Sequence, residues 1–251
     1  MTVKTASEIK LMEKVGRIAA EALQYAGKHV KAGISTNELD QLANDYILSK
    51  GATSACIGYH GYPKAICTSV NDVICHGLPD ETILKDGDII NIDVTALYQG
   101  FHGDTSATFA VGAITPEAQT LVDCAFGAMH AGIKAVKAGN TTGDIGFAVE
   151  KFVNRRGFWV VREIGGHGIG RIFHEEPFVP SYGRKGKGPK LAKWGTITVE
   201  PMVNQTAAPI REFDIKGSTV TVFRTSDKTL SAQFEHTILI TDEGAEILTV
   251  C

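Results

Sequence analysis

Residues 30–51, VKAGISTNELDQLANDYILSKG, return 106 positions later as residues 136–157, VKAGNTTGDIGFAVEKFVNRRG. The VKAG tetrapeptide is identical in the two copies. A threonine, an acid, an aliphatic residue, an aromatic residue and a closing glycine then match without a gap. A self-similarity of this length indicates a duplicated structural unit. In the first copy Ser35 and Glu38 form a capping-box pattern that predicts a helix ending at Gly51.

The sequence around this repeat predicts two related halves. Thr5 and Glu8 predict the start of a helix that precedes the first copy of the repeat. Pro116 lies near the start of a predicted helix that precedes the second copy. The second copy itself predicts a helix over about 142–156. After a one-residue gap the repeat continues, with Asp93 matching Glu200 at the end of a short apolar run. We therefore expect an α+β fold in which two pseudo-symmetric helix–helix–strand halves surround a curved antiparallel sheet. Residues 1–251 would form one domain, with internal halves of about 1–111 and 112–251 and a site between them.

The composition is that of a globular protein with no strong charge. The 251 residues are 43% hydrophobic and 21% charged, and the formal net charge is −3, which gives no overall attraction to nucleic acid. The residues after Met1 lack the apolar segment of a secretory signal, and no stretch is apolar enough to predict a membrane span. The five cysteines form no CxxC pair. These features favour a reduced, cytoplasmic protein.

Four carboxylates are predicted at the ends of apolar strands. Asp93 and Asp104 fall on two adjacent strands, while Glu200 and Glu235 border two later ones. A single strand-end acid is most often a turn residue. Four acids that are all predicted to be half-buried would repel one another unless protons or cations neutralised them. With one imidazole, such a set suits Mn²⁺, Fe²⁺ or Co²⁺, and bridging carboxylates could hold a pair of ions.

The imidazole is expected from a glycine-rich block, EIGGHGIGRIFHEEP at residues 163–177, which holds His167 and His174. Its glycine spacing differs from the dinucleotide-binding fingerprint, and the block contains no HExxH zinc motif. A lone histidine is more often structural, but the glycines around His167 indicate a close backbone approach.

The acids and histidines lie in six motifs that together resemble the type I methionine aminopeptidases of the pita-bread fold. The resemblance spans residues 7–248, and its motifs are CHG at 75–77, NIDV at 91–94, GFHGDTS at 100–106, GHGIGRIFHEEP at 166–177, EPMVN at 200–204 and SAQFEHT at 231–237. It implies a metallo-exopeptidase that removes the initiator methionine from nascent proteins or short peptides with a small second residue. Hydrolysis would proceed by hydroxide attack from a centre of two divalent ions, Co²⁺, Mn²⁺, Fe²⁺ or Zn²⁺.

Roles for individual residues follow from the same resemblance. The implied metal ligands are Asp93, Asp104, His167, Glu200 and Glu235, with Asp104 and Glu235 bridging. Glu200 would also shuttle a proton, His76 would contact the scissile amide, and His174 would face the carbonyl oxygen. The implied methionine pocket consists of Cys56, Tyr59, Tyr62, Cys67 and Phe173, whose sulfur atoms and rings suit a thioether. A monovalent cation is expected near Asn71, Val73 and Ser231.

Two stretches depart from the family pattern, and one of them is basic. Residues 181–194 have Trp194 where a proline is common, and the longer stretch 205–226 has Ser218 where a tryptophan often closes the pocket. We expect both to affect the pocket rim. A basic run such as Arg184, Lys185, Lys187 and Lys190 more often forms a solvated surface loop. The alternative is that this run makes a weak contact with the ribosome. We expect a monomer with no membrane partner.

Three other functions compete with this interpretation. A proline-directed peptidase of the same fold usually carries an additional N-terminal domain. A catalytically inactive binding protein is disfavoured because all the implied ligands are present. A nuclease or phosphatase could use the same ligands, but the apolar pocket offers little to hold a phosphate.

Overall fold

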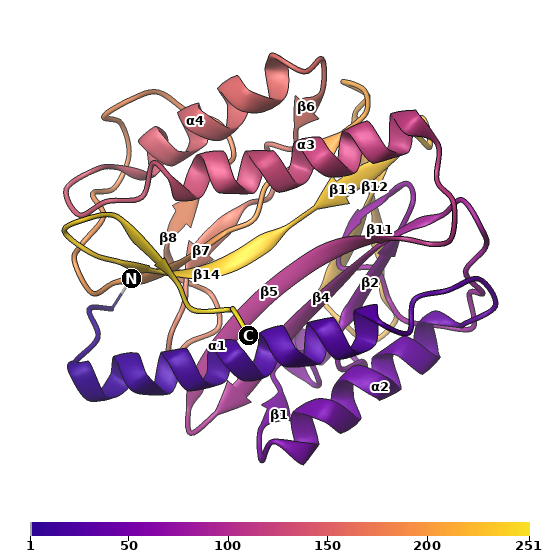
Figure 1. The fold of residues 1–251 in the computed structure, drawn as a ribbon, viewed down its shortest axis with the longest axis horizontal. Coiled ribbons are helices and arrows are strands. Elements are labelled where there is room, and N and C mark those ends of the chain that lie inside the picture. The colour runs from indigo at the N-terminus through magenta and orange to yellow at the C-terminus, as the bar shows by residue number, and fades with distance from the viewer. Residues whose placement is uncertain (1) are drawn as a thin grey trace.

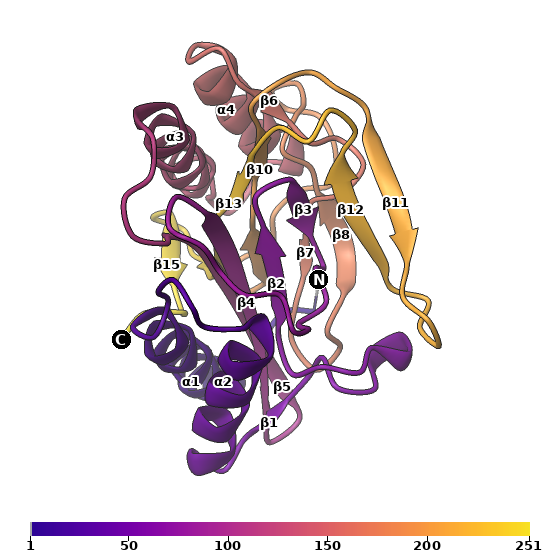
Figure 2. The same cartoon turned by 90° about the vertical axis from the view of Figure 1, so that its right-hand side faces the viewer.

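Residues 2–251 are described by a computed structural model, in which helices cover one face of a curved antiparallel sheet (Figures 1 and 2). Helices α1 and α2 lie along one half of the sheet and α3 and α4 along the other, as the repeat predicted. The expected α+β fold is therefore confirmed. Within the described residues, no helix is both long enough and apolar enough to cross a membrane.

Side chains that the sequence identified as caps begin the helices. Thr5 Oγ1 accepts a hydrogen bond from Glu8 N, and the Glu8 carboxylate accepts one from Thr5 N, which satisfies two free N–H groups at the start of the first helix. Ser35 and Glu38 do the same for the second helix. The helices are α1 Ala6–Gly27, α2 Thr36–Ser49, α3 Pro116–Ile133 and α4 Thr142–Asn154. The last one ends two residues before its predicted end.

The central sheet joins strands from both halves of the chain. Its order is β1-β4-β5-β14-β9-β7-β8, with β2 added to β4 and β15 added to β14. Two three-stranded sheets, β13-β10-β6 and β11-β12-β3, flank it. The strands are β1 Thr53–Ser54, β2 Cys67–Val70, β3 Val73–Cys75, β4 Ile89–Tyr98, β5 Phe101–Ala110, β6 Trp159–Val160, β7 Gly166–Gly168, β8 Glu175–Val179, β9 Thr196–Val199, β10 Met202–Asn204, β11 Ile210–Asp214, β12 Thr221–Thr225, β13 Ser231–Gln233, β14 Glu235–Ile240 and β15 Ala245–Ile247.

The repeated sequence makes the same backbone contacts in each half. Gly33 N donates to Leu84 O over 2.9 Å in the first half, and Gly139 N donates to Leu191 O over 3.0 Å in the second. The donors Gly33 and Gly139 are 106 residues apart, and the acceptors Leu84 and Leu191 are 107 residues apart. The difference is the one-residue gap that the sequence predicted. Each contact ties the loop between the two helices of a pair to the segment that precedes β4 or β9, and Asp93 and Glu200 lie on or directly after these strands. The exact division at 111 and 112 stays a prediction.

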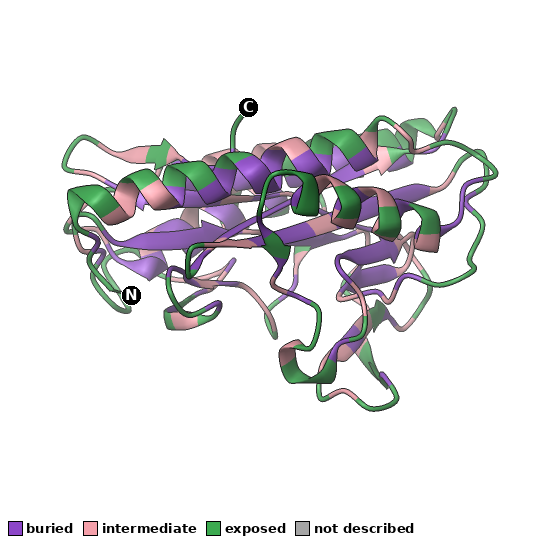
Figure 3. Cartoon of the chain, turned by 90° about the horizontal axis from the view of Figure 1, so that it is seen from below, coloured by how far each residue is buried: buried purple, intermediate pink, exposed green. Residues whose placement is uncertain are grey.

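The apolar core follows the same division. One buried cluster packs α1 and α2 against the sheet with residues such as Met12, Leu39 and Ile92, and another packs α3 and α4 against it with residues such as Leu121 and Ile238. The outward faces of the helices are exposed, while the sheet beneath them is mostly buried (Figure 3). Each helix pair therefore fixes one half of the sheet by burying apolar surface.

Helix α1 packs very closely against the C-terminal segment at Gly16. A Cβ atom at this position would lie 2.4 Å from Leu248 O and 2.8 Å from Leu248 C. Both are backbone atoms, so relief would require moving the helix or the segment that follows β15.

We predict that Gly16→Ala destabilises the protein although alanine favours helices. The helix propensity gain of about 1 kcal/mol is outweighed by the backbone clash, so the free energy of unfolding should fall by about 1–3 kcal/mol. Urea unfolding at an unchanged slope would measure this fall. Glu13→Ala is the control, since Glu13 is exposed on the same helix and should change stability by less than about 0.5 kcal/mol. A stabilised Gly16→Ala protein would contradict the packing.

Candidate metal centre

Two of the predicted carboxylates lie on the paired strands β4 and β5. Asp104 is opposite Thr95 in the register, and Asp93 precedes Thr95 by two residues, so both acids point to the same face of the sheet. Thr95 Oγ1 donates to Asp104 Oδ1 over 2.8 Å. The sequence had suggested that both acids lie at strand ends. In the structure both lie in the interior of ten-residue strands. The long β4–β5 hairpin continues past the site on both sides.

The other two carboxylates come from the second half of the chain. Glu200 directly follows β9, and Glu235 begins β14, which pairs with both β9 and β5. Thr198 Oγ1 donates to Glu200 Oε1 over 2.6 Å, and Gln233 Nε2 lies 3.4 Å from Glu200 Oε2. Because β14 lies between β5 and β9, it brings the acids of the two halves together.

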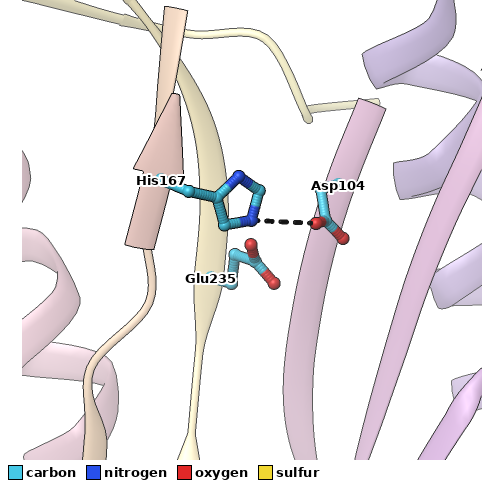
Figure 4. Close-up of side chains that lie close together, drawn as sticks. All are labelled: Asp104, His167 and Glu235. Carbon is cyan, nitrogen blue, oxygen red and sulfur yellow. Dashed lines mark ion pairs between the residues drawn. The ribbon is translucent and has the colours of Figure 1, made fainter. Parts of the chain in front are cut away.

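His167 on β7 completes this cluster. Its Nε2 atom lies 3.7 Å from Asp104 Oδ2 and 3.6 Å from Glu200 Oε1. Figure 4 shows its ring pointing toward Asp104 with Glu235 beside them, and ligand atoms of these three residues lie within 4.8 Å of one another. Gly166 has to be a glycine here, because a Cβ atom would lie 2.4 Å from Thr198 O.

The tautomer of His167 suits a ligand. Its Nδ1 atom lies 2.9 Å from Gly168 O, a carbonyl that can only accept, so Nδ1 carries the proton and the Nε2 lone pair faces the acids. Burial lowers the pKa of His167 to about 4, which keeps the ring neutral near pH 7. A neutral imidazole with its second nitrogen bonded to a carbonyl is the usual form of a metal-binding histidine.

The carboxylates are crowded to a degree that favours bound cations. Burial raises the pKa of Asp93 and of Glu200 to about 7. Burial, together with the neighbouring acids, raises the pKa of Asp104 and of Glu235 well above the usual range. Asp93 Oδ1 is buried and has no hydrogen-bond partner among residues 2–251. Four buried carboxyl groups and one neutral imidazole are a donor set that fits hard or borderline divalent ions.

The cluster forms one end of a cavity of about 270 Å³. All the residues for which the sequence predicted metal, catalytic or substrate contacts line this cavity, namely Cys56, Tyr59, Tyr62, Cys67, His76, Asp93, Asp104, His167, Phe173, His174, Glu200 and Glu235. The same cavity is also lined by an apolar cluster that includes Cys56, Cys67 and Phe173, of which Cys67 pairs with Asp93 in the register of β2 and β4. The cavity thus joins a polar, acidic end to an apolar end.

Two further histidines face this cavity with their rings held by hydrogen bonds. His76 follows β3 with a positive φ of 58°, and its Nδ1 atom lies 3.0 Å from the carbonyl oxygen of Thr221. His174 Nδ1 lies 2.6 Å from the hydroxyl of Tyr59. Burial lowers the pKa of His76 and brings that of His174 to about 3, so both rings are neutral near pH 7.

The sequence did not identify several residues of the cavity wall, namely Thr95, Ile164, Gly165 and Val220. Val220 comes from the connection between β11 and β12, and its proximity depends on how this ribbon folds back over the cavity. Of the two stretches expected at the rim, only 205–226 contributes to the wall. Trp194 does not line the cavity; its backbone bonds to Lys4 and Ile240 instead.

Two predicted features lie outside the cavity. Ser231 N donates to Asn71 O over 2.9 Å, so two of the residues expected near a monovalent cation are in contact. The basic residues Arg184, Lys185, Lys187 and Lys190 lie on an exposed loop between β8 and β9. The cation and the contact with a ribosome both stay predictions.

Comparisons with known proteins agree with this geometry. Residues 10–242 match metallopeptidase family M24. The chain is 49% identical to the methionine aminopeptidase of Escherichia coli K12 over the whole chain and 94% of that protein. A crystal structure of methionine aminopeptidase from Rickettsia prowazekii superposes with a TM-score of 0.96 at 41% identity and covers all of both chains.

A more distant structure shares the fold alone. The prolidase of Pyrococcus furiosus superposes with a TM-score of 0.79 at 22% identity, over 99% of this chain but 65% of that one. The similarity to proteins of matching length is much higher, and it agrees with the acids, the histidines and the apolar pocket described above. The chain therefore belongs to metallopeptidase family M24 and, within it, to the methionine aminopeptidases.

Proposed function

We propose that this protein removes an N-terminal methionine from nascent chains and short peptides whose second residue is small. The observation that carries the proposal is one cavity of about 270 Å³ that is lined both by the apolar cluster and by the four acids. The sulfur atoms and rings of its apolar end suit a thioether. The acidic end would hold the free amino group of the substrate close to the bond that is cut.

The acidic end would bind two divalent metal ions. Asp93, Asp104, His167, Glu200 and Glu235 are the proposed ligands, with Asp104 and Glu235 shared between the ions. When bound, the ions would supply an activated water and polarise the substrate carbonyl. Support comes from the unpaired Asp93 Oδ1 and from the elevated pKa values of the four carboxyl groups, because cations would relieve both.

Three side chains would then act on the substrate. Glu200 lies in the cavity beside the other acids, where its carboxylate would accept a proton and give it to the leaving amine. His76 donates from Nδ1 to Thr221 O, so its Nε2 is an acceptor for the N–H of the scissile amide. His174 would stabilise the negative charge that develops on the carbonyl oxygen.

The chain would work as a reduced, cytoplasmic monomer. All the residues with a proposed part in the reaction line one cavity of this chain. Cys56, Cys67, Cys75 and Cys124 are free and buried, which is usual in a reducing compartment. We include a monovalent cation near the carbonyl groups of Asn71 and Val73, where the contact with Ser231 supports it.

The basic loop at 184–190 would contact the ribosome through its phosphates. Lys185 lies with Lys151, Arg155 and Arg156 along a groove between α3 and α4. The carboxylate of Asp144, also in this groove, is held by hydrogen bonds from Thr141 and Gly186. A cluster of cations on a protein whose net charge is −3 is suited to a polyanion.

We predict that the metal-depleted protein releases methionine from Met-Ala-Ser, but not from Met-Leu-Ser, once Mn²⁺, Fe²⁺ or Co²⁺ is added. Each ion is tested separately, and free methionine is measured. N-acetylated Met-Ala-Ser is the control and should not be cut, because its amino group is blocked. No release with any ion, despite measured metal binding, would favour a catalytically inactive binding protein. Cleavage of Met-Leu-Ser would contradict the requirement for a small second residue.

We predict that metal binding releases more protons at pH 6 than at pH 8. Asp93 and Glu200, with pKa values of about 7, are mostly protonated at pH 6 and mostly ionised at pH 8, and metal ligands must be ionised. His167 contributes no proton, because its pKa of about 4 keeps it neutral at both pH values. Calorimetric titration in two buffers of different ionisation enthalpy counts the protons. Equal release at the two pH values would contradict the assigned ligands.

We predict that the protein co-sediments with ribosomes at low salt and dissociates steeply between about 50 and 200 mM salt. The double variant Lys185→Glu, Lys187→Glu should bind much more weakly, because it reverses the charge of the loop. Lys10→Glu is the matched control, since Lys10 is exposed on α1 in the other half of the molecule. Binding that ignores salt, or an equal loss in the control, would exclude the loop as the contact.

A further inference from the structure

The imidazole of His174 belongs to a stack of three rings beside the cavity. Its ring lies 4.2 Å from that of Phe173 with 13° between their planes, and Phe173 lies 5.5 Å from His102, again at 13°. His102 Nδ1 lies 2.9 Å from Gly170 O, which ties the outer ring to the backbone. The stack therefore holds the plane of the His174 ring.

Stacking leaves open which nitrogen of His174 carries the proton. In a neutral imidazole one nitrogen is an N–H donor and the other is an acceptor, so a neutral His174 has two possible tautomers. Only a hydrogen bond to one of the nitrogens can select between the two tautomers. The choice decides whether the nitrogen that faces the substrate donates or accepts.

Tyr59 makes the hydrogen bond that can select the tautomer. Its hydroxyl lies 2.6 Å from His174 Nδ1, and its ring packs 4.9 Å from that of Phe173. Hydroxyl donors make shorter hydrogen bonds than N–H donors do, so this separation favours the hydroxyl as the donor. Burial raises the pKa of Tyr59, so its hydroxyl keeps a proton to donate. This geometry points to Tyr59 as the donor and His174 Nδ1 as the acceptor.

Two of the three histidines that line the cavity have the opposite arrangement. In His76 and His167 the Nδ1 atom faces a backbone carbonyl oxygen, which can only accept, so Nδ1 must donate. His174 is the one whose Nδ1 faces a hydroxyl. Its tautomer can therefore differ from that of its neighbours in the same buried cavity.

We propose that Tyr59 is a positioning residue that holds His174 as the Nε2–H tautomer. This inference rests on the proposed function, in which His174 faces the carbonyl oxygen of the substrate. With Nδ1 occupied, Nε2–H is the donor that points to the developing negative charge. In the other tautomer, a lone pair on Nε2 would face that charge and repel it.

The chain holds Tyr59 itself in place through the ribbon of β11 and β12. Tyr59 begins a short 3-10 turn, Tyr59–Gly61. Thr219 N and Ser218 Oγ both donate to His60 O over 2.9 Å. Gly61 has a φ of 80°, and a Cβ atom there would lie 2.4 Å from Gly217 O. The loop that holds Ser218 thus fastens the turn from which Tyr59 reaches His174.

The alternative is that Tyr59 only provides apolar contact in the methionine pocket. Tyr59→Phe separates the two roles, because it keeps the ring and removes the hydroxyl. We expect kcat on Met-Ala-Ser to fall about ten- to a hundredfold, as for other groups that orient a reactive residue, while KM changes little. Unchanged kcat, or an effect confined to KM, would overturn the proposal.

A double-mutant cycle tests whether Tyr59 acts through His174. Tyr59→Phe should lower kcat no further in a His174→Ala protein, because the group that it orients is gone. An equal fall in both backgrounds would overturn the proposal. Tyr46→Phe is the matched control: it also removes a hydroxyl that makes a side-chain hydrogen bond, to Glu21, and should leave kcat unchanged.

The tautomer can be measured without activity. Long-range ¹H–¹⁵N spectra of metal-free protein with ¹⁵N-labelled histidine distinguish protonated from bare ring nitrogens, and the His174→Gln spectrum assigns the signals. We expect a bare Nδ1 and a protonated Nε2 in the wild type, and a mixture of tautomers in Tyr59→Phe. A protonated Nδ1 in the wild type, or no change in the variant, would overturn the proposal. If the wild type proves inactive on peptides, the proposed function fails while this spectrum still decides the tautomer.

Discussion

Four carboxyl groups that line one cavity, on or beside β4, β5, β9 and β14, are the constraint on which the rest of the structure depends. Buried acids repel one another and lose their hydration, which is why burial raises the pKa of all four. Such a cluster is tolerable only if cations occupy it or if it stays protonated, and in either case the scaffold has to hold it without relaxing. Two separate apolar cores, one under each helix pair, supply that rigidity.

The duplication explains how the scaffold delivers acids to one point. Each half uses the same contact, Gly33 with Leu84 or Gly139 with Leu191, to tie the loop between its two helices to the segment before β4 or β9. The pairing of β5 with β14 then joins the halves, and Glu235 at the start of β14 comes opposite Ser106 of β5. A shift of one residue in this register would turn the carboxylates to the other face of the sheet. The register at this joint therefore matters as much as the residues themselves.

Local sequence signals predicted most of this structure. The helix starts at Thr5 and Ser35 follow from side-chain capping, and the curved sheet with its two helix pairs follows from the repeat. Contacts between distant segments were beyond such signals. Asp93 and Asp104 lie within strands because the β4–β5 hairpin is longer than its apolar run suggests. Val220 lines the cavity because of how the ribbon of β11 and β12 folds, and Trp194 lies away from it because of the path of the loop between β8 and β9. Neither segment has a periodic sequence pattern from which its path could be predicted.

The cavity also shows how one environment can give three histidines different roles. Burial lowers the pKa of His76, His167 and His174 alike, which favours neutral rings near pH 7. Their chemistry then depends on which nitrogen carries the proton, and the partner of Nδ1 sets this. A carbonyl partner makes Nε2 an acceptor, which suits a metal ion beside His167 and an amide N–H beside His76. A hydroxyl that donates to Nδ1 would make Nε2 a donor, which would suit the proposed oxyanion beside His174. On this proposal, the different roles of the three rings follow from the hydrogen-bond partners of their Nδ1 atoms.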